Sequence, residues 1–490
     1  MALPSLVREL HATTTQLQWV VDAYNLVFAA LLLTFGSLSD RLGRKGMLLA
    51  GLTVFGAASL AGGFTTSPAQ LIAARAVMGL GAAMTFPATL SLISNVFTER
   101  RERARAIGLW GAIAGVAIAL GPIAGGWLLE HFSWSSIFVA MAPVAAACIL
   151  LVLASVPASK SSGAAPVDTA GLVLSTATMA LLVFTIIEAP DYGWGSTRTL
   201  AGFAVSAVLL TAFIWWERRT SHPMLDVRLF RNMRFSAASG AVTVSFFTLF
   251  GFIFLMTQYF QFVRGYGPLS TGVHLLPVAL SVGVFSVAGT QLAVRAGTKL
   301  VVTLGLLAMA AFYGWVAAAT TATIGYGIIA VQMVLYGLGM GLTSAPATES
   351  IMGAVSRRQA GVGAAVNDTT RLLGGTLGVA VIGSVFASLY GSRLTAGLPA
   401  GLPRPAVAAA HQSLGAAYAV AGRVPGALGQ AIHTAATNAF LHGLSVGCLV
   451  AGGVAAAGAI LAVLFLPAQP ASPAVVAPAE AVPVKTPVRD

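Results

Sequence analysis

The chain has 490 residues, of which 57% are hydrophobic and 9% are charged, against roughly 25% charged residues in ordinary globular proteins. So few charges cannot cover a water-facing surface, which excludes a string of soluble domains and predicts a chain that lies mostly in lipid. The net charge of +12 would favour nucleic-acid binding only if it were clustered, and it is not. Cys148 and Cys448 both lie in apolar runs, which excludes a disulfide framework and a cysteine metal site.

A membrane-crossing helix needs about 20 mostly apolar residues. In chain order, such runs occur at 17–39, 46–65, 70–94, 104–129, 134–156, 167–188, 199–217, 235–259, 270–292, 299–319, 324–346, 362–389 and 438–466. Because lipid offers no partners to backbone polar groups, each run is predicted to be a helix. The sequence therefore predicts an all-α polytopic membrane protein with thirteen visible spans.

The basic residues give a test of this span count, because they concentrate on the cytoplasmic side of membrane proteins. With the loop after the first run placed inside, 19 of the 27 basic residues fall on the cytoplasmic side, six fall outside and two lie within spans. This regular alternation predicts a multi-pass protein of the plasma membrane. It also predicts that the Pro-rich tail, 467–490, is cytoplasmic and disordered.

A sequence repeat predicts two helical halves. Gly79-Leu80-Gly81 through Thr89 recurs as Gly337-Leu338-Gly339 through Thr348, and each copy precedes a pair of arginines. The copies lie eight spans apart, whereas parallel six-helix halves would place them six apart. We therefore expect two inserted helices. The predicted organisation is a first half at 1–156, inserted helices and a cytoplasmic loop at 157–234, and a second half at 235–466 with a long outer loop at 390–437.

Three segments carry recognisable motifs. The loop after the first span reads GSLSDRLGRK, where glycines allow a sharp turn and the aspartate can pair with a basic residue or a helix end; its motif residues are Gly36, Asp40, Arg41, Gly43 and Arg44. Arg75 precedes Gly79 and Gly81 within the third span. The fourth span carries a proline and small residues that favour a bend and close packing, at Gly115, Gly121, Pro122, Gly125 and Gly126.

These motifs resemble those of the major facilitator superfamily. The Glu217–Phe230 segment and the inserted helices resemble its fourteen-helix drug:proton antiporter branch, which includes multidrug and quaternary-ammonium efflux pumps. The resemblance implies two six-helix halves plus two linker helices. It also implies a proton-transfer role for Arg75, although Met78 stands where the family usually has glutamine. Met1–Ser5 resembles the end of the family's first helix, so we expect that helix to be missing because translation was assigned to an internal start codon.

Ionisable residues inside membrane spans are functional candidates. Asp22 and Arg75 each lie about five residues into spans of the same direction, roughly 7–8 Å below the outer boundary. We expect Asp22 to titrate, with Arg75 adjusting its pKa, and proton and drug to compete for one charge; a static ion pair is the alternative. Glu349 is a second candidate for proton or cation binding. Asp368 and Arg371 are expected to neutralise each other, and Glu188 to be an interface residue.

Aromatic residues at Tyr24, Trp110, Tyr259 and Tyr336 are candidates for a cavity that binds flat cations through their ring faces. The sequence has no phosphate-binding loop, nucleophile elbow or metal-ligand spacing, so we expect no catalytic residue, no metal and no cofactor, with a proton gradient as energy source. The expected partners are a small-molecule substrate, protons and the lipid bilayer, without nucleic acid, and the monomer is expected to be the functional unit.

The function expected from these observations is proton-coupled export of lipophilic cationic drugs or toxic compounds by alternating access. One alternative keeps the fold but exports an endogenous antibiotic, lipid or other metabolite. A second alternative is a membrane sensor that has lost transport. The intact loop motif and Asp22 argue against the sensor, because neither has an obvious use without a conformational cycle.

Overall fold

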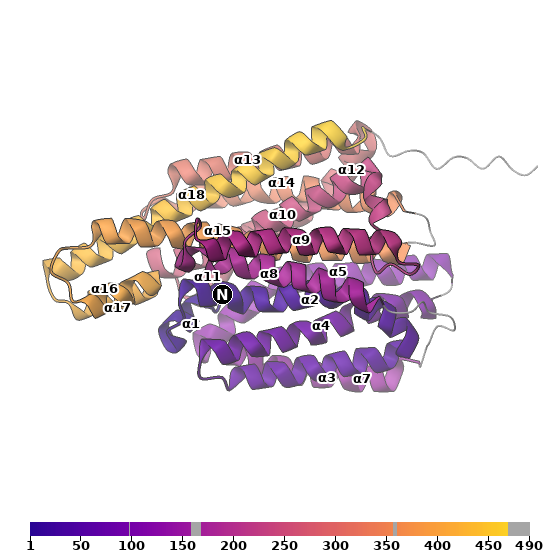
Figure 1. Cartoon of the computed structure of the whole chain (residues 1–490), viewed down its shortest axis with the longest axis horizontal. Helices are drawn as coiled ribbons and strands as arrows, with labels where there is room; N and C mark the ends of the chain where they lie inside the picture. The colour runs from indigo at the N-terminus through magenta and orange to yellow at the C-terminus, as the bar shows by residue number, and fades with distance from the viewer. Residues whose placement is uncertain (98, 158–167, 356–359, 469–490) are drawn as a thin grey trace, which may run out of the picture.

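The computed structural model describes residues 1–97, 99–157, 168–355 and 360–468. Every regular element in these ranges is helical, and most of the long helices run roughly parallel to the long axis of the molecule (Figure 1). Twelve of the described helices are long and apolar enough to cross a membrane, and they match twelve of the predicted spans. The other predicted span, 104–129, lies within the 32-residue helix α5. The prediction of an all-α polytopic protein is confirmed.

The first half and the inserted pair follow the predicted order. The predicted span at 134–156 is divided at Ala140 into a short helix and a long one. The elements are α1 (Leu3–Leu10), α2 (Thr14–Leu42), α3 (Arg44–Gly63), α4 (Pro68–Val96), α5 (Arg100–His131), α6 (Ser136–Val139), α7 (Met141–Ser155), α8 (Thr169–Tyr192) and α9 (Thr197–Arg219).

The second half begins after a short 3₁₀ helix. Its elements are η1 (Val227–Arg231), α10 (Met233–Gln258), the π-helix η2 (Tyr259–Val263), α11 (Pro268–His274), α12 (Leu276–Ala296), α13 (Thr298–Ala319), α14 (Tyr326–Gly353), α15 (Ala360–Gly397), α16 (Arg404–Gln412), α17 (Leu414–Arg423) and α18 (Ala427–Phe465). We call the end of the bundle that carries α1, α16 and α17 the α1 end, and the end that carries the α2–α3 turn the Arg44 end (Figure 1).

The predicted outer loop at 390–437 is largely helical, which corrects the sequence prediction. α15 continues to Gly397, α16 and α17 follow, and α18 already begins at Ala427. The physical reason is local: this segment is rich in alanine, the best helix former. In addition, Pro405 occupies the first turn of α16 and Ser413 caps α17 by accepting a hydrogen bond from the amide of Ala416 at 3.2 Å.

Glycine contacts repeat between the two halves. A Cβ on Gly81 of α4 would lie 2.8 Å from the carbonyl of Gly51 on α3, and one on Gly339 of α14 would lie 2.6 Å from the carbonyl of Gly305 on α13. Each helix therefore packs backbone against backbone at the matching position, as small residues allow. The turn between α2 and α3 also has its counterpart, since Gly43 and Gly297 both adopt positive φ, at 118° and 87°.

This repeat yields a stability prediction. Replacing Gly339 with Val should lower the free energy of unfolding by about 1–3 kcal/mol, because the added atoms must displace the backbone of α13. Gly314→Ala on α13 is the matched control, because nothing lies within 4 Å of the Cβ position there. The thermal transition of the purified protein in detergent reports both; equal transitions for Gly339→Val and the wild type would contradict the packing argument.

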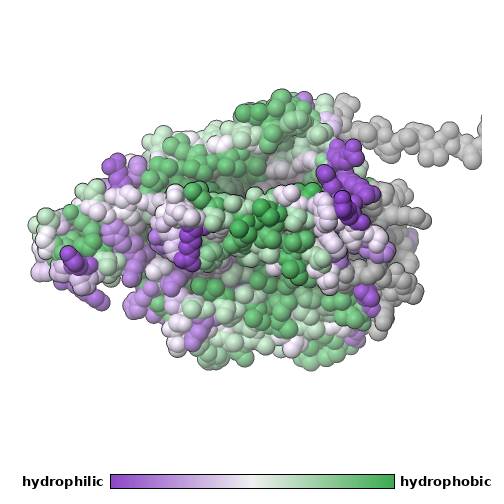
Figure 2. Space-filling model, viewed as in Figure 1, coloured by the Kyte–Doolittle hydropathy of each residue, from purple (hydrophilic) through white to green (hydrophobic). Residues whose placement is uncertain are grey.

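The surface agrees with a membrane-embedded bundle. Hydrophobic side chains dominate the middle of the visible face, and hydrophilic ones gather towards its two ends (Figure 2). Leu210 on α9 and Leu150 on α7, for example, are 48% and 67% exposed. A large apolar surface of this kind would be energetically costly in water. The protein is therefore an integral membrane protein.

Candidate functional site

The two halves meet at the α1 end through α2 and α15. Gln18 of α2 is fully buried, and its amide group donates to the carbonyls of Val379 and Ala380 at 3.2 and 3.1 Å and to the hydroxyl of Ser384 at 3.3 Å. Gly383 of α15 lies against the Gln18 side chain. The long helix α2 of the first half is thereby fixed to α15, the fifth long helix of the second half, so this end of the bundle is closed.

The inserted helix α8 completes the closure. The indole N–H of Trp19 donates to Glu188 at 2.9 Å, and Leu26 packs with Val183, Ile187 and Ala380. α8 thus contacts both α2 and α15. Glu188, expected to be an interface residue at the outer end of its helix, thus holds α8 against α2.

Asp22 lies on the same face of α2 as Gln18, one turn further from the α1 end. The side chain has no exposed surface, and neither carboxylate oxygen has a hydrogen-bond partner within the described residues. Asn25, 5% exposed, continues this stripe at the next helical position, so polar groups follow one face at the spacing of an α-helix. Burial of an unpaired charge is expensive, so this arrangement suits a neutral carboxyl group.

Thr376 of α15 lies one turn before Ala380, on the face that meets α2. It is 1% exposed, and its hydroxyl also lacks a hydrogen-bond partner among the described residues. α2 and α15 run in opposite directions, and Gln18 meets Ala380 while Leu32 and Leu372 pack in one cluster. Asp22 and Thr376 therefore lie at the same level between the halves. Sequence reasoning missed Gln18 and Thr376, although the stripe at 18, 22 and 25 was readable.

Arg75 is bound to α2, but not to Asp22. Its Nε donates to the carbonyl of Val20 at 2.9 Å, and its guanidinium lies 4.3 Å from the ring centre of Tyr24. Val20 and Tyr24 each lie two residues from Asp22, about 200° around the helix. Asp22 thus points away from α4, and the predicted pairing with Arg75 is not made in this structure. Arg75 instead ties α4 to α2.

The loop motif forms the turn at the Arg44 end. α2 ends at Leu42, Gly43 adopts its positive φ, and Arg44 begins α3. Gly36 lies near Pro87 of α4, and Arg41 is exposed. The side chain of Asp40 lies outside the described residues, so its predicted partner stays a prediction.

The motif on α5 meets the second half at one position. A Cβ on Gly126 would lie 2.7 Å from the Cα of Leu269 and the carbonyl oxygen of Pro268, whereas Gly121 and Gly125 face open space. Pro122 lies within α5, and its carbonyl group meets Gly272 of α11. Gly115 and Trp110 belong to α5, but the surroundings of these two residues lie outside what the structure describes. The close approach of α5 to α11 is a second contact between the halves near the α1 end.

The other predicted charged residues, Glu349, Asp368 and Arg371, lie towards the Arg44 end. Glu349 on α14 is exposed, which leaves its predicted role in cation or proton binding as a prediction. Arg371 donates to the hydroxyl of Thr348 at 3.2 Å and interacts electrostatically with Asp368, as expected for residues three apart on one helix.

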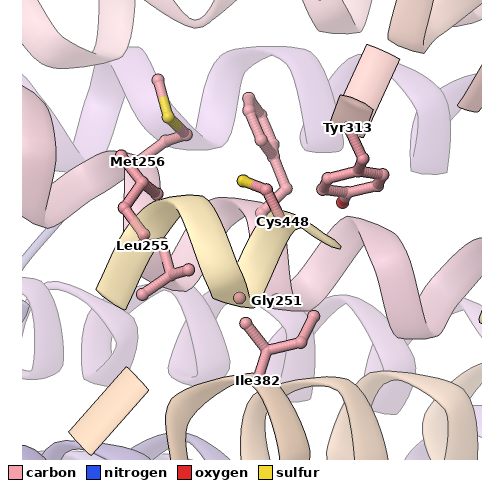
Figure 3. Close-up of a pocket in the computed structure, with 9 residues that line it drawn as sticks. Gly251, Leu255, Met256, Tyr313, Ile382 and Cys448 are labelled. Carbon is pink, nitrogen blue, oxygen red and sulfur yellow. The ribbon is translucent and has the colours of Figure 1, made fainter. Parts of the chain in front are cut away.

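Two of the predicted cavity aromatics are buried within the second half. Tyr259 donates to the carbonyl of Thr321 at 2.8 Å, and the hydroxyl of Tyr336 lies 3.2 Å from that of Thr248. A small hollow nearby is apolar, with Leu255, Met256, Tyr313, Ile382 and Cys448 around it (Figure 3). It carries no charged group, so the Asp22 region between the halves is the better candidate site. The described residues contain no group of three potential metal ligands.

Two helical halves are in contact at one end, with a buried carboxyl group between them, an arrangement that fits a membrane transporter. The family model of the Major Facilitator Superfamily matches residues 1–379. The chain belongs to that superfamily, and it is a transport protein rather than an enzyme.

The chain is similar over most of its length to proteins named for drug efflux or resistance. It is 35% identical to the multidrug efflux pump LfrA of Mycolicibacterium smegmatis, with 95% of this chain and 92% of LfrA covered. It is 35% identical to the methyl viologen resistance protein SmvA of Salmonella typhimurium (92% and 91% covered). It is 31% identical to the tetracenomycin C resistance and export protein of Streptomyces glaucescens (96% and 88% covered).

Solved structures agree on the fold. The chain superposes on a bacterial homologue of the human lysosomal transporter Spinster with a TM-score of 0.67, at 16% identity, covering 95% of this chain and 92% of that one. At this identity the likeness concerns the fold alone.

Proposed function

We propose that this protein exports lipophilic cationic drugs or toxic compounds across the plasma membrane in exchange for protons. The observation that carries the proposal is Asp22, a carboxyl group buried between the two halves with no hydrogen-bond partner in the described part of the chain. Three relatives that share its length are named for multidrug efflux, methyl viologen resistance, or drug resistance and export. We further propose that the C-terminus is cytoplasmic and that the monomer is the functional unit.

In the proposed mechanism, Asp22 is neutral while α2 and α15 are in contact. When the halves separate at the α1 end, on the expected outer side, water reaches the carboxyl group, which releases the cation and takes up a proton. That proton leaves on the cytoplasmic side, where the charged form binds the next cation. Inward movement of each proton would supply about 2.3 kcal/mol per 100 mV of membrane potential. The small-molecule substrate and the proton thus use one site in turn, without a bound cofactor.

A second candidate function is export of an endogenous antibiotic or other metabolite. It is favoured by the similarity to the tetracenomycin C resistance and export protein. Both candidate functions use the same fold and the same proton gradient, and they differ in the substrate that is exported.

Ethidium transport by everted membrane vesicles tests the proposed function. Vesicles that contain the protein should concentrate ethidium several-fold when respiration acidifies their interior, because protons leaving the vesicle drive the cation in. A protonophore should abolish this accumulation within the time of mixing. Accumulation that survives the protonophore would contradict proton coupling, and absence of ethidium transport together with export of a metabolite would favour the second candidate.

A further inference from the structure

Two carboxylates meet at the Arg44 end, where the inserted helices join the second half. Glu217, in the last turn of α9, is 2% exposed, and its Oε1 has no hydrogen-bond partner within the described residues. Asp168 caps the start of α8, accepting from the amide of Gly171 at 2.8 Å and the indole N–H of Trp216 at 2.9 Å.

Gly171 shows how close these carboxylates are. A Cβ at this position would lie 2.6 Å from Glu217 Oε1 and 2.6 Å from Asp168 Oδ2. No more than twice that distance therefore separates the two oxygens. The space between them exists because residue 171 has no side chain, and any larger residue would push the two carboxylates apart.

Among the residues that the structure describes, the charged groups that act on Glu217 offer it no compensating cation. Asp168 from α8 and Asp226, which caps η1, both act on it and are both acidic. Arg228 donates instead to the backbone carbonyl of Arg218, at 3.4 Å. Two charged carboxylates this close, with one oxygen buried and unpaired, repel each other strongly, and a shared proton removes the repulsion.

Glu217 also holds the chain that leads into the second half. Its Oε2 accepts the amide of Leu225 at 3.2 Å. The sulfur of the preceding residue, Met224, accepts from the hydroxyl of Thr34 on α2 at 3.2 Å, and Leu225 packs against the main apolar core. The segment 220–226 therefore links the inserted pair, the first half and the second half at one point.

We propose that Glu217 is a second proton-binding site, and that its protonation keeps the segment 220–226 docked against α2. Loss of the proton places two negative charges side by side in a buried position. The charged oxygen then gains by reaching water, and this gain in hydration outweighs the hydrogen bond from the Leu225 amide, so Glu217 and that amide move apart. The segment undocks as the pH at the Arg44 end rises. This site is independent of Asp22 and of the identity of the cargo.

Hydrogen exchange of the purified full-length protein tests this inference without a transport assay. Exchange of the 220–226 amides is measured at pH 6 and pH 8 and divided by the intrinsic rate at each pH. In the wild type we expect the protection of this segment to fall about tenfold between pH 6 and pH 8. Glu217→Gln keeps an acceptor for Leu225 but cannot ionise, so its protection should be the same at both pH values.

Further variants and controls keep the test decisive. Asp168→Asn removes the repulsion and should reduce the fall in protection, which provides a second route if Glu217→Gln does not fold. Glu99→Gln, at an exposed position before α5, should behave as the wild type does. Equal protection of the wild type at both pH values would overturn the proposal. So would a fall that persists in Glu217→Gln, or a segment that responds to added Mg²⁺ instead of pH.

Discussion

Asp22→Asn is expected to reduce protonophore-sensitive ethidium efflux by about tenfold or more while leaving the protein folded. The amide cannot exchange a proton, so the gradient loses its point of coupling and only downhill movement remains. A tenfold change corresponds to about 1.4 kcal/mol, which is less than the drive that one proton would supply at 100 mV. The measurement is efflux from preloaded cells or vesicles, with the thermal transition of the purified protein recorded beside it.

The control for this substitution is Glu9→Gln, which makes the same chemical change at an exposed position on α1 and should leave efflux unchanged. Because Asp22 is buried and has no hydrogen-bond partner among the residues described, the neutral amide should fold at least as well as the carboxyl group. Undiminished coupled efflux by Asp22→Asn, at equal expression, would show that the proton is carried elsewhere, with Glu349 the next residue to test.

A disulfide between Gln18→Cys and Gly383→Cys is expected to stop transport completely and reversibly. The Cβ position of Gly383 lies 3.0 Å from Cγ of Gln18, which places the two Cβ atoms near the range that a disulfide requires. The bridge would hold α2 against α15 and keep the α1 end closed. Efflux should disappear on mild oxidation and return on reduction, in a background where Cys148 and Cys448 are replaced.

Each single cysteine variant is the control for this experiment, since oxidation should leave its efflux unchanged. Reversal by reductant separates the effect of the bridge from the effect of losing the Gln18 hydrogen bonds. If the double variant forms its disulfide quantitatively and still transports, then α2 and α15 do not separate during the cycle. The alternating-access mechanism proposed for this interface would then be wrong.

Much of the fold follows from the sequence because its causes are local. Apolar runs of the right length specify the spans, and the alternation of the basic loops supports the number of spans. The pairing of Gly81 with Gly51 and of Gly339 with Gly305 follows the repeat, since close backbone contact requires small residues at both positions. The helical character of 390–437 was also available from its alanine content, and the loop prediction gave too much weight to its glycine and proline residues.

The site was harder to predict because the sequence indicates how far along a helix a residue lies but not which neighbouring helix its side chain faces. Equal depth placed Asp22 and Arg75 together, yet Arg75 contacts the opposite face of α2. Which neighbour occupies which face depends on packing between distant segments, such as α15 against Gln18. Glu217 was visible in the sequence only as part of a motif, because its proximity to Asp168 depends on how α8 and α9 pack.

The two long helices beside the α16–α17 pair, α15 and α18, form a projection at the α1 end of the molecule. α18 has 39 residues and would measure about 58 Å as a straight α-helix, while the hydrocarbon layer is about 30 Å thick. Together with α15 it carries the outer part of α16 and α17 beyond the rest of the bundle (Figure 1), while Gly415 of α17 packs against Val7 of α1. Single-particle images of small membrane proteins are hard to align because the micelle hides them, and this firm projection offers both an asymmetric landmark and an epitope for an antibody fragment.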